Sequence, residues 1–293
     1  MESRISNHQS EMPGILYLVA TPIGNLRDVS FRALETLRSV DVIACEDTRH
    51  TRKLLNFYEI SNKLVSYHEH NEQVRSAELI SRLAAGDSVA VVSDAGTPGI
   101  NDPGFVIVQK AVQAGISVVP IPGPAAFVAA AVASGIPTDA IFFGGFLPSK
   151  KGERRKRLGE LSSVPATLVF YESPNRLARS LADCLDILGD RNAAFAREIT
   201  KLHEEIVRGT LRSLATAAAS APVKGEIVIV IERAGREKAE VKELSSLTER
   251  VREIEAAGAD NKSALKQAAK EFGVGKSEAY RMLQAEKNSA ESS

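Results

Sequence analysis

The chain has 293 residues, which is long enough for two ordinary domains, each with its own hydrophobic core. Its 37 Lys and Arg residues balance 37 Asp and Glu residues, so the overall charge favours neither a nucleic acid nor a membrane surface as a partner. Two cysteines without a Cys-x-x-Cys pair, and no histidine pair spaced for one helix face, argue against a disulfide framework and a zinc site.

The start of the chain, MESRISNHQSEMPG, is polar and contains acids, unlike a secretory signal or a transit peptide. The long apolar stretch at residues 117–137 is interrupted by four prolines, so it predicts a strand, a turn and a buried helix rather than a membrane span. We therefore expect a cytoplasmic protein that needs no metal and no membrane.

The first 122 residues alternate short apolar runs with helical patterns. Buried strands are expected at residues 15–20, 41–46, 88–93 and 117–121, and helices at 30–40, near 51–58, at 72–85 and at 103–114. Strands that are apolar throughout and joined by helices indicate a parallel sheet covered on both faces. The sequence therefore predicts an N-terminal α/β domain over residues 1–122.

The pattern changes after this point. Strands are expected at residues 141–146, 167–172, 193–199, 204–210 and 226–232, and the third and fourth are separated by a hairpin-short link. This spacing predicts a second α/β domain, residues 123–235, whose sheet contains antiparallel pairs. Residues 236–293 begin with a charged linker and end in short helical patterns.

Three loops rich in glycine or proline follow strands of the first domain. They are TPIGNLRD at 21–28, SDAGTPGINDPG at 93–104 and PIPGPAA at 120–126. Ligands of open α/β sheets bind beyond the carboxyl ends of the strands, and glycine lets the backbone approach a ligand closely. Each loop alone could be an ordinary turn, but three at equivalent strand ends indicate a binding site. None has the pattern of a Walker loop or a Gly-x-Gly-x-x-Gly fingerprint.

Long motifs carry a resemblance to a known family. LVATPIGNLRDVSFRALETLRSVDVIACEDTRHTRKLL, VSDAGTPGINDPG, PIPGPAAFVAA, GGFLP, FYESPNR and AREITKLHEE occur in order between residues 15 and 232. The chain thereby resembles the ribosomal RNA small-subunit methyltransferase I family, a branch of the tetrapyrrole-methylase superfamily of S-adenosylmethionine enzymes. The resemblance implies a two-domain α/β enzyme, usually a homodimer, with the methyl donor in the interdomain cleft. It also implies 2′-O-methylation of a cytidine in the decoding region of small-subunit (16S) ribosomal RNA.

The resemblance also implies which residues contact S-adenosylmethionine. The six positions that match the superfamily's donor loops are Asp94, Ala95, Gly96, Thr97, Gly123 and Pro124. Two positions depart from the pattern of many superfamily members. The loop after the first strand is not rich in glycine, and Ala125 stands where many have serine, so Ala125 would contribute a backbone contact at most.

Methyl transfer to a ribose hydroxyl requires alignment of the two groups and a base or cation that helps the proton to leave. Glu46 and Asp47, after the second strand, and Lys201, in the second domain, are the candidates for this role. Lys201 would act as a base only if its own pKa were depressed. The alternatives are structural: Asp47 as a helix N-cap, and Lys201 in a solvated hairpin with surface ion pairs.

Basic residues offer candidate contacts to RNA phosphates. The candidates are Arg49, Arg154 and Arg155 in KKGERRKR, Arg197, and Lys276 and Arg281 in the tail. The tail pattern at 261–283 resembles a helix-turn-helix, which favours an auxiliary RNA-binding element. The alternatives are a solvated helix face for the basic run and a packing or dimer module for the tail.

Two other functions fit parts of the sequence. The same fold could methylate a tetrapyrrole or a modified histidine on a translation factor, although the basic run and tail would then have no role. A protein with a helix-turn-helix could instead be a ligand-responsive DNA-binding regulator.

Overall fold

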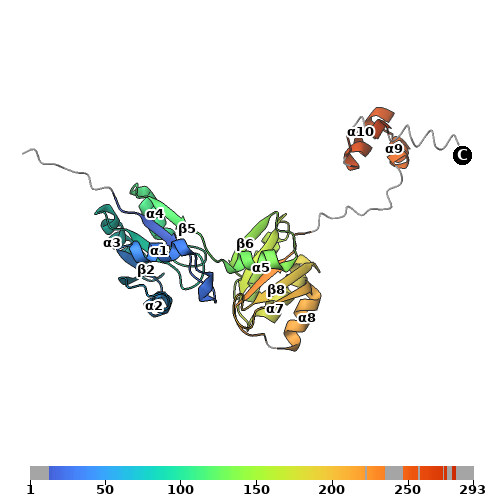
Figure 1. Ribbon diagram of the computed structural model, residues 1–293. Coiled ribbons are helices and arrows are strands. Elements are labelled where there is room, and N and C mark those ends of the chain that lie inside the picture. Colours follow the sequence, from blue (N-terminus) through green and yellow to red (C-terminus); the bar gives the residue numbers. More distant parts are fainter. Residues whose placement is uncertain are drawn as a thin grey trace, which may run out of the picture. The chain divides into compact units, whose positions relative to one another are not determined.

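A computed structural model of the chain describes residues 13–221, 223–234, 247–256, 258–272, 274–275 and 279–281 (Figure 1). The chain divides into two compact units, residues 1–234 and residues 235–293. The first unit contains two five-stranded sheets.

The first sheet is parallel throughout, as predicted. Its strands are β1 (Leu16–Val19), β2 (Val42–Cys45), β3 (Leu64–Ser66), β4 (Val89–Val92) and β5 (Val118–Ile121), in the order β3-β2-β4-β1-β5. Every residue of β2 and β4 is buried, which explains their uninterrupted apolar sequences. β3 was not predicted, because this edge strand has three half-buried residues and hence no clear apolar pattern.

Helices cover both faces of this sheet and produce two hydrophobic cores. The helical elements are the 3-10 turn η1 (Leu26–Asp28), α1 (Phe31–Ser39), α2 (Thr48–Phe57), α3 (Glu72–Ala84) and α4 (Phe105–Gln113). Leu37 of α1 and Leu55 of α2 belong to one core, while Leu83 of α3 and Ile107 of α4 belong to the other. The two-faced coverage expected from the sequence is thus confirmed.

The second sheet is mixed, as the sequence predicted. Its strands are β6 (Ile141–Phe146), β7 (Thr167–Glu172), β8 (Asn192–Arg197), β9 (Glu205–Thr210) and β10 (Ile227–Ile231), in the order β6-β7-β10-β8-β9. Only the β6–β7 pair among these is parallel.

Helices also cover the second sheet. They are α5 (Ala126–Ser134), α6 (Lys151–Leu161), α7 (Leu177–Leu188) and α8 (Leu211–Ser220). Ala130 of α5 packs in one core, and Leu158, Leu181 and Leu214 of the other three helices pack in a second core. Residues 174–176 form a turn, and α7 begins directly after it at Leu177.

The second unit contains α9 (Leu247–Ala256), α10 (Asn261–Glu271) and a helical turn at residues 279–281. These segments share a small core in which Val251, Leu265, Ala268 and Ala279 are buried and Phe272 and Val274 are partly buried. The predicted helical tail is confirmed by this core. Lys276 lies outside the described residues.

Candidate functional site

The three glycine- and proline-rich loops meet at one edge of the first sheet. They follow β1, β4 and β5, which are neighbours in the order β4-β1-β5. Thr21 and Gly96 exchange backbone hydrogen bonds of 2.8 and 3.0 Å, and the Thr97 hydroxyl donates to the Pro124 carbonyl at 3.4 Å. A Cβ at Gly123 would lie 2.8 Å from the Cβ of Ala20, so the third loop is packed closely against the end of β1. The predicted convergence of the loops is confirmed.

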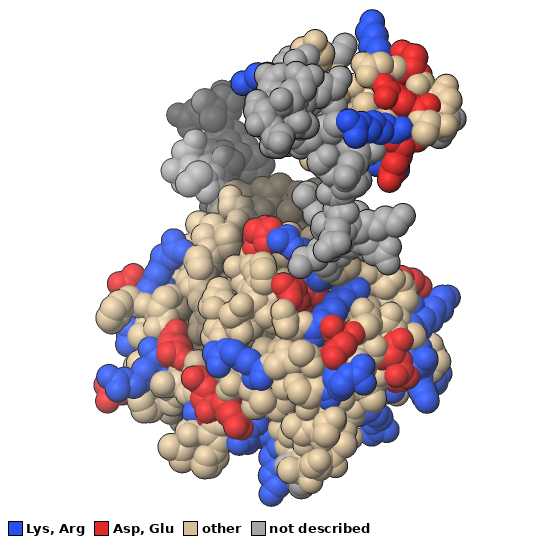
Figure 2. All heavy atoms as spheres, turned by 90° about the vertical axis from the view of Figure 1, so that its right-hand side faces the viewer, with Lys and Arg blue, Asp and Glu red and all other residues tan. Residues whose placement is uncertain are grey.

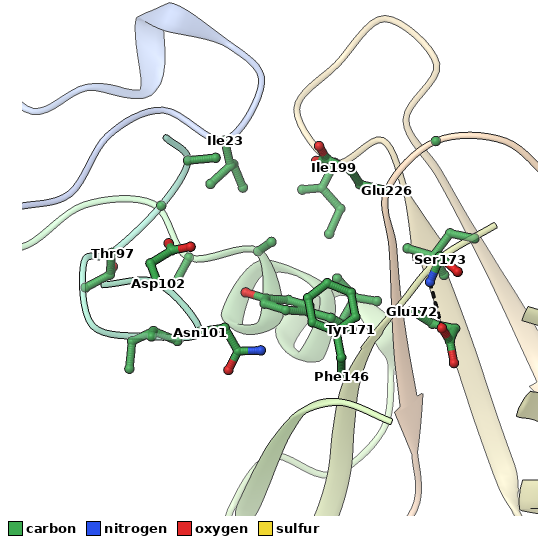
Figure 3. A pocket seen from close by; sticks show the side chains of 18 of the residues that line it. Ile23, Thr97, Asn101, Asp102, Phe146, Tyr171, Glu172, Ser173, Ile199 and Glu226 are labelled. Carbon is green, nitrogen blue, oxygen red and sulfur yellow. Dashed lines mark hydrogen bonds between the residues drawn. The ribbon is translucent and has the colours of Figure 1, made fainter. Parts of the chain in front are cut away.

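Beside these loops lies a cavity of about 420 Å³ (Figure 3). Its first-sheet wall includes Ile23, residues 95–97, Asn101 and Asp102. Its second-sheet wall includes Phe146, Tyr171, Glu172, Ile199 and Glu226. Figure 3 shows these two groups of side chains on opposite sides of the cavity. Its volume lies within the range of sites that enclose a nucleoside-sized ligand.

Three of the six predicted donor contacts, Ala95, Gly96 and Thr97, line this cavity. Gly96 has a φ of +85°, a left-handed conformation that glycine adopts without strain. Asp94 lies beside a second cavity of about 30 Å³, where its carboxylate accepts the Asp47 backbone N–H at 3.1 Å. Gly123 and Pro124 are not among the lining residues, whereas Ala125 and Ala126 are.

Asp102 also lines the cavity, although no sequence pattern marked it as a site residue within its loop. Burial, together with the negative charges of Glu46 and Asp94, raises the pKa of Asp102 to about 6. Burial and the charge of Asp94 also raise the pKa of Glu46. Negative charge is therefore concentrated beside the cavity, an electrostatic environment that favours a cationic ligand.

Asp47 is used as a helix cap. It is the N-cap of α2, and its carboxylate accepts the Arg49 backbone N–H at 2.8 Å. Hydrogen bonds from the Arg49 side chain and backbone lower the pKa of Asp47 to about 2. The contacts of Asp47 are thus those of a helix N-cap, the structural alternative to a catalytic role. So low a pKa also makes Asp47 a poor base. The Arg49 side chain is 89% exposed, which leaves its outer face accessible.

Lys201 occupies a constrained loop beside the cavity. Glu198 and Thr200 adopt left-handed φ values of +50° and +67°, and the Lys201 ammonium lies 3.0 Å from Glu198 and 3.1 Å from Glu226. Desolvation lowers the pKa of Lys201, but the hydrogen bonds to these carboxylates outweigh it and the net shift is upward. The depressed pKa that Lys201 would need to act as a base is therefore not found, and its other predicted role, a cation that helps the hydroxyl proton to leave, stays a prediction.

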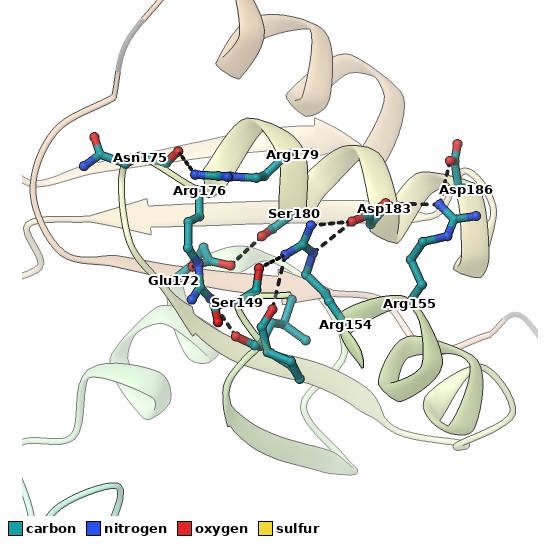
Figure 4. A network of polar contacts seen from close by, with 12 residues as sticks. Ser149, Arg154, Arg155, Glu172, Asn175, Arg176, Arg179, Ser180, Asp183 and Asp186 are labelled. Carbon is teal, nitrogen blue, oxygen red and sulfur yellow. Dashed lines mark hydrogen bonds and ion pairs between the residues drawn. The ribbon is translucent and has the colours of Figure 1, made fainter. Parts of the chain in front are cut away.

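The prediction that Arg154 contacts RNA also requires correction. Arg154 is 2% exposed and donates to Asp183 at 2.6 and 2.9 Å and to the carbonyls of Pro148 and Ser149 at 3.2 and 3.0 Å (Figure 4). The Arg154 guanidinium thus connects the loop after β6 to α7. A phosphate contact would require breaking this buried network.

The other predicted RNA contacts are more accessible, but some are paired. Arg155 bonds to Asp183 and Asp186, and its side chain is 34% exposed. Arg197 bonds to Glu205 at 2.6 Å across the β8–β9 pair, and its side chain is 28% exposed. Arg281 is exposed on the second unit.

Figure 2 shows Lys and Arg side chains interspersed with Asp and Glu side chains among the described residues of the displayed face. No continuous basic surface forms there. Across the part of the chain that the structure describes, no helix is both long and apolar enough to span a bilayer. The described His, Cys, Asp and Glu side chains form no group of three or more arranged to hold a metal ion.

Comparison with known proteins identifies the family. The family described as Tetrapyrrole (Corrin/Porphyrin) Methylases matches residues 15–215. Ribosomal RNA small subunit methyltransferase I of Halalkalibacterium halodurans is 48% identical over 98% of this chain and 100% of its own length. The protein of the same name from Bacillus subtilis is 46% identical, over 94% of this chain and 95% of the relative.

Solved structures share the fold. Uroporphyrin-III-C-methyltransferase from Thermus thermophilus superposes with a TM-score of 0.54 at 20% identity, covering 75% of this chain and 95% of that one. Diphthine synthase superposes with a TM-score of 0.58 at 16% identity, covering 75% of this chain and 90% of that one. This chain therefore belongs to the ribosomal RNA small subunit methyltransferase I family within the tetrapyrrole methylases, and is an enzyme that uses S-adenosylmethionine as methyl donor.

Proposed function

We propose that this enzyme methylates the 2′-hydroxyl of a cytidine in the decoding region of 16S ribosomal RNA. The proposal rests on the relatives' names and on the cavity where the three first-sheet loops meet the second sheet. We expect the enzyme to act in the cytoplasm on the small ribosomal subunit.

The cavity suits the methyl donor, which is a nucleoside with cationic groups. Residues 95–97 bring backbone and small side chains to the cavity wall, which lets a ligand approach closely, and the Asp102 carboxylate offers a negative charge beside the cavity. When bound, S-adenosylmethionine supplies a methyl group activated by a positively charged sulfur. Asp94, Gly123 and Pro124 stay proposed donor contacts. Asp94 also accepts the Asp47 backbone N–H, and the Pro124 carbonyl accepts the Thr97 hydroxyl.

Glu46 is our candidate for the group that accepts the ribose proton. It directly follows β2, and its charge acts on Asp102 in the cavity wall. Burial raises the pKa of Glu46, which makes its carboxylate a stronger base than an ordinary glutamate. Asp47 and Lys201 are less suited, because one has a pKa of about 2 and the other stays protonated.

Cations outside the cavity would position the RNA by its phosphates. Arg49 is the leading candidate because its side chain is exposed and it lies in the first turn of α2, two residues beyond the N-cap Asp47. Lys201 would contribute a second positive charge beside Glu226. Arg155, Arg197, Arg281 and the undescribed Lys276 are proposed phosphate contacts of lower rank. All three of Arg49, Arg155 and Arg197 pair with carboxylates, but the last two are only 34% and 28% exposed, against 89% for Arg49.

We expect a homodimer in which a second copy covers the outer face of α5. This helix contains no charged residue, and Val128 and Val132, one turn apart, are 44% and 68% exposed. Val132→Asp should therefore shift the enzyme from dimer to monomer in sedimentation velocity. An unchanged dimer would remove α5 from the interface.

Transfer of a labelled methyl group to small ribosomal subunits that lack the modification tests the function directly. We expect one methyl per subunit on a cytidine ribose, identified by nucleoside mass spectrometry and by resistance of the adjoining phosphodiester to alkali. Label on a base, or transfer to a tetrapyrrole instead of the RNA, would contradict the proposal. The regulator alternative is disfavoured, because a relative named as a methyltransferase aligns over 98% of this chain, tail included.

A further inference from the structure

Phe146 presents an aromatic ring at the second-sheet wall of the cavity. It is the last residue of β6 and is 58% exposed although it lines the cavity. Its ring centroid lies 5.5 Å from that of Tyr171, with the planes inclined by 59° (Figure 3). The ring is thus available for contact with a bound molecule.

A β-bulge gives Phe146 this position. β6 and β7 pair regularly up to Phe143↔Val169, but Phe146 is then paired with Tyr171, so three steps along β6 match two along β7. Paired residues point to the same face of a sheet. The extra residue therefore brings Phe146, rather than residue 145, beside Tyr171 on the cavity face. Bulges near active sites commonly redirect a side chain in this way.

Two glycines make the bulge possible. A Cβ at Gly144 would lie 2.5 Å from the Phe170 ring. Gly145 has a φ of +63°, and a Cβ there would lie 2.7 Å from the Asn101 amide. The same bend that aims Phe146 also fits against the first-sheet loop that carries Asp102.

The ring has firm support from the sheet. Tyr171 makes an edge contact with Phe143 at 5.0 Å, and Phe143 stacks on Phe127 of α5 at 4.3 Å. This series of rings continues into the core on the α5 side of the sheet. Phe146 therefore lies on a preorganised aromatic surface, and its exposed side is the part that the protein leaves uncovered.

We infer that Phe146 is the platform on which the base of the acceptor nucleotide stacks; this inference rests on the proposed RNA substrate. An RNA is too large to enter the cavity, so only an unstacked nucleotide can bring its ribose to the methyl group. The base of that nucleotide must then lie at the mouth, where an exposed ring can cover its face. Stacking accepts any base, so Phe146 holds the nucleotide without selecting cytosine.

Substitutions at Phe146 separate stacking from simple packing. We expect Phe146→Ala to lower kcat/KM for small ribosomal subunits by about tenfold, within the roughly 5- to 150-fold range of base stacking, chiefly through KM. Phe146→Trp should retain activity, while Phe146→Leu, which keeps an apolar side chain but no aromatic face, should resemble the alanine variant. Donor affinity, measured by calorimetry, should stay within twofold of wild type in all three.

Phe57→Ala is the matched control, because Phe57 is also 58% exposed but does not line the cavity. It should leave KM unchanged.

The inference would be overturned if Phe146→Ala weakened donor binding as much as RNA methylation, since the ring would then contact the donor's adenine. Wild-type KM in Phe146→Ala or in Phe146→Leu would also overturn it. A wild-type enzyme that left the RNA unmethylated would overturn the proposed function and the platform together, whereas an active wild type with an unimpaired Phe146→Ala would overturn the platform alone.

Discussion

The two walls of the cavity are built differently. The first-sheet wall is largely backbone and small side chains at residues 95–97, held by backbone hydrogen bonds between the loops after β1 and β4. The second-sheet wall consists mainly of large side chains, with Phe146, Tyr171 and Ile199 prominent among them. A wall of backbone and small side chains lets a small ligand such as the methyl donor approach closely. A wall of large side chains can fit the shape of a bulkier acceptor. We therefore expect substitutions in the first wall to affect the donor, and substitutions in the second to affect the acceptor.

The largest effect is expected at Glu46, at the first-sheet edge. Glu46→Gln removes the proposed proton acceptor, so kcat should fall by about 10²- to 10⁴-fold, the usual contribution of general base catalysis. Donor affinity should change little, which stopped-flow methylation and calorimetry together would reveal. Glu35→Gln, at an exposed position of α1, is the matched control. Full activity of Glu46→Gln would remove Glu46 from the chemistry.

The next effect concerns the support of the second wall. Arg154→Ala leaves the buried Asp183 carboxylate without its principal partner and should destabilise the protein by about 3–5 kcal/mol in urea unfolding. Arg155→Ala removes a neighbouring arginine that contacts the same carboxylate from a more exposed position, and should cost clearly less. Equal losses would show that burial does not distinguish these two arginines.

Asp102 tests whether the first wall binds the donor. Asp102→Asn removes a negative charge without changing the size of the side chain, and should weaken donor binding by about 10- to 100-fold, as expected for a hydrogen bond to a charged group. Asp190→Asn, at an exposed position outside the cavity, should bind the donor normally. If Asp102→Asn changed KM for RNA alone, the division between the two walls would be wrong.

The pKa of Asp102 predicts a smaller, pH-dependent effect. Because its pKa is about 6 in the free enzyme, most molecules carry the charge at pH 7 and about one in ten carries it at pH 5. The donor's cationic groups favour the ionised carboxylate, so its affinity should fall about tenfold between pH 7 and pH 5, with the steepest change near pH 6. In Asp102→Asn this dependence should disappear. A pH profile that persisted unchanged in the variant would assign it to another group.

The first wall was more accessible to sequence reasoning than the second. Glycine and proline after buried strands mark loops, and parallel strands bring such loops to one edge, so the meeting of the loops after β1, β4 and β5 could be predicted. Phe146 could not be placed in this way, because its face depends on a one-residue bulge, which alternation along the strand does not reveal.

The charge of a residue was also not enough to predict its role from the sequence. Arg154 and Arg155 are adjacent and chemically identical, and both bond to Asp183 of α7, yet one is fully buried and the other is partly exposed. Arg154 differs in that it also donates to the carbonyls of the loop after β6. Asp102 lies in one of the predicted loops, but its raised pKa comes first from burial and then from the charges of Glu46 and Asp94. Burial and the position of Glu46 depend on the folded structure. In both cases the property of the residue depends on its neighbours in the folded structure.

We propose that the cavity between the two walls holds the methyl donor. A crystal structure with S-adenosylhomocysteine tests it most directly. We predict that the adenosyl group will lie in this cavity, within hydrogen-bonding distance of the backbone at residues 95–97, with Asp102 nearest the sulfur and amino groups. Ordered ligand density at any other place, with this cavity filled only by solvent, would show that the donor site lies elsewhere.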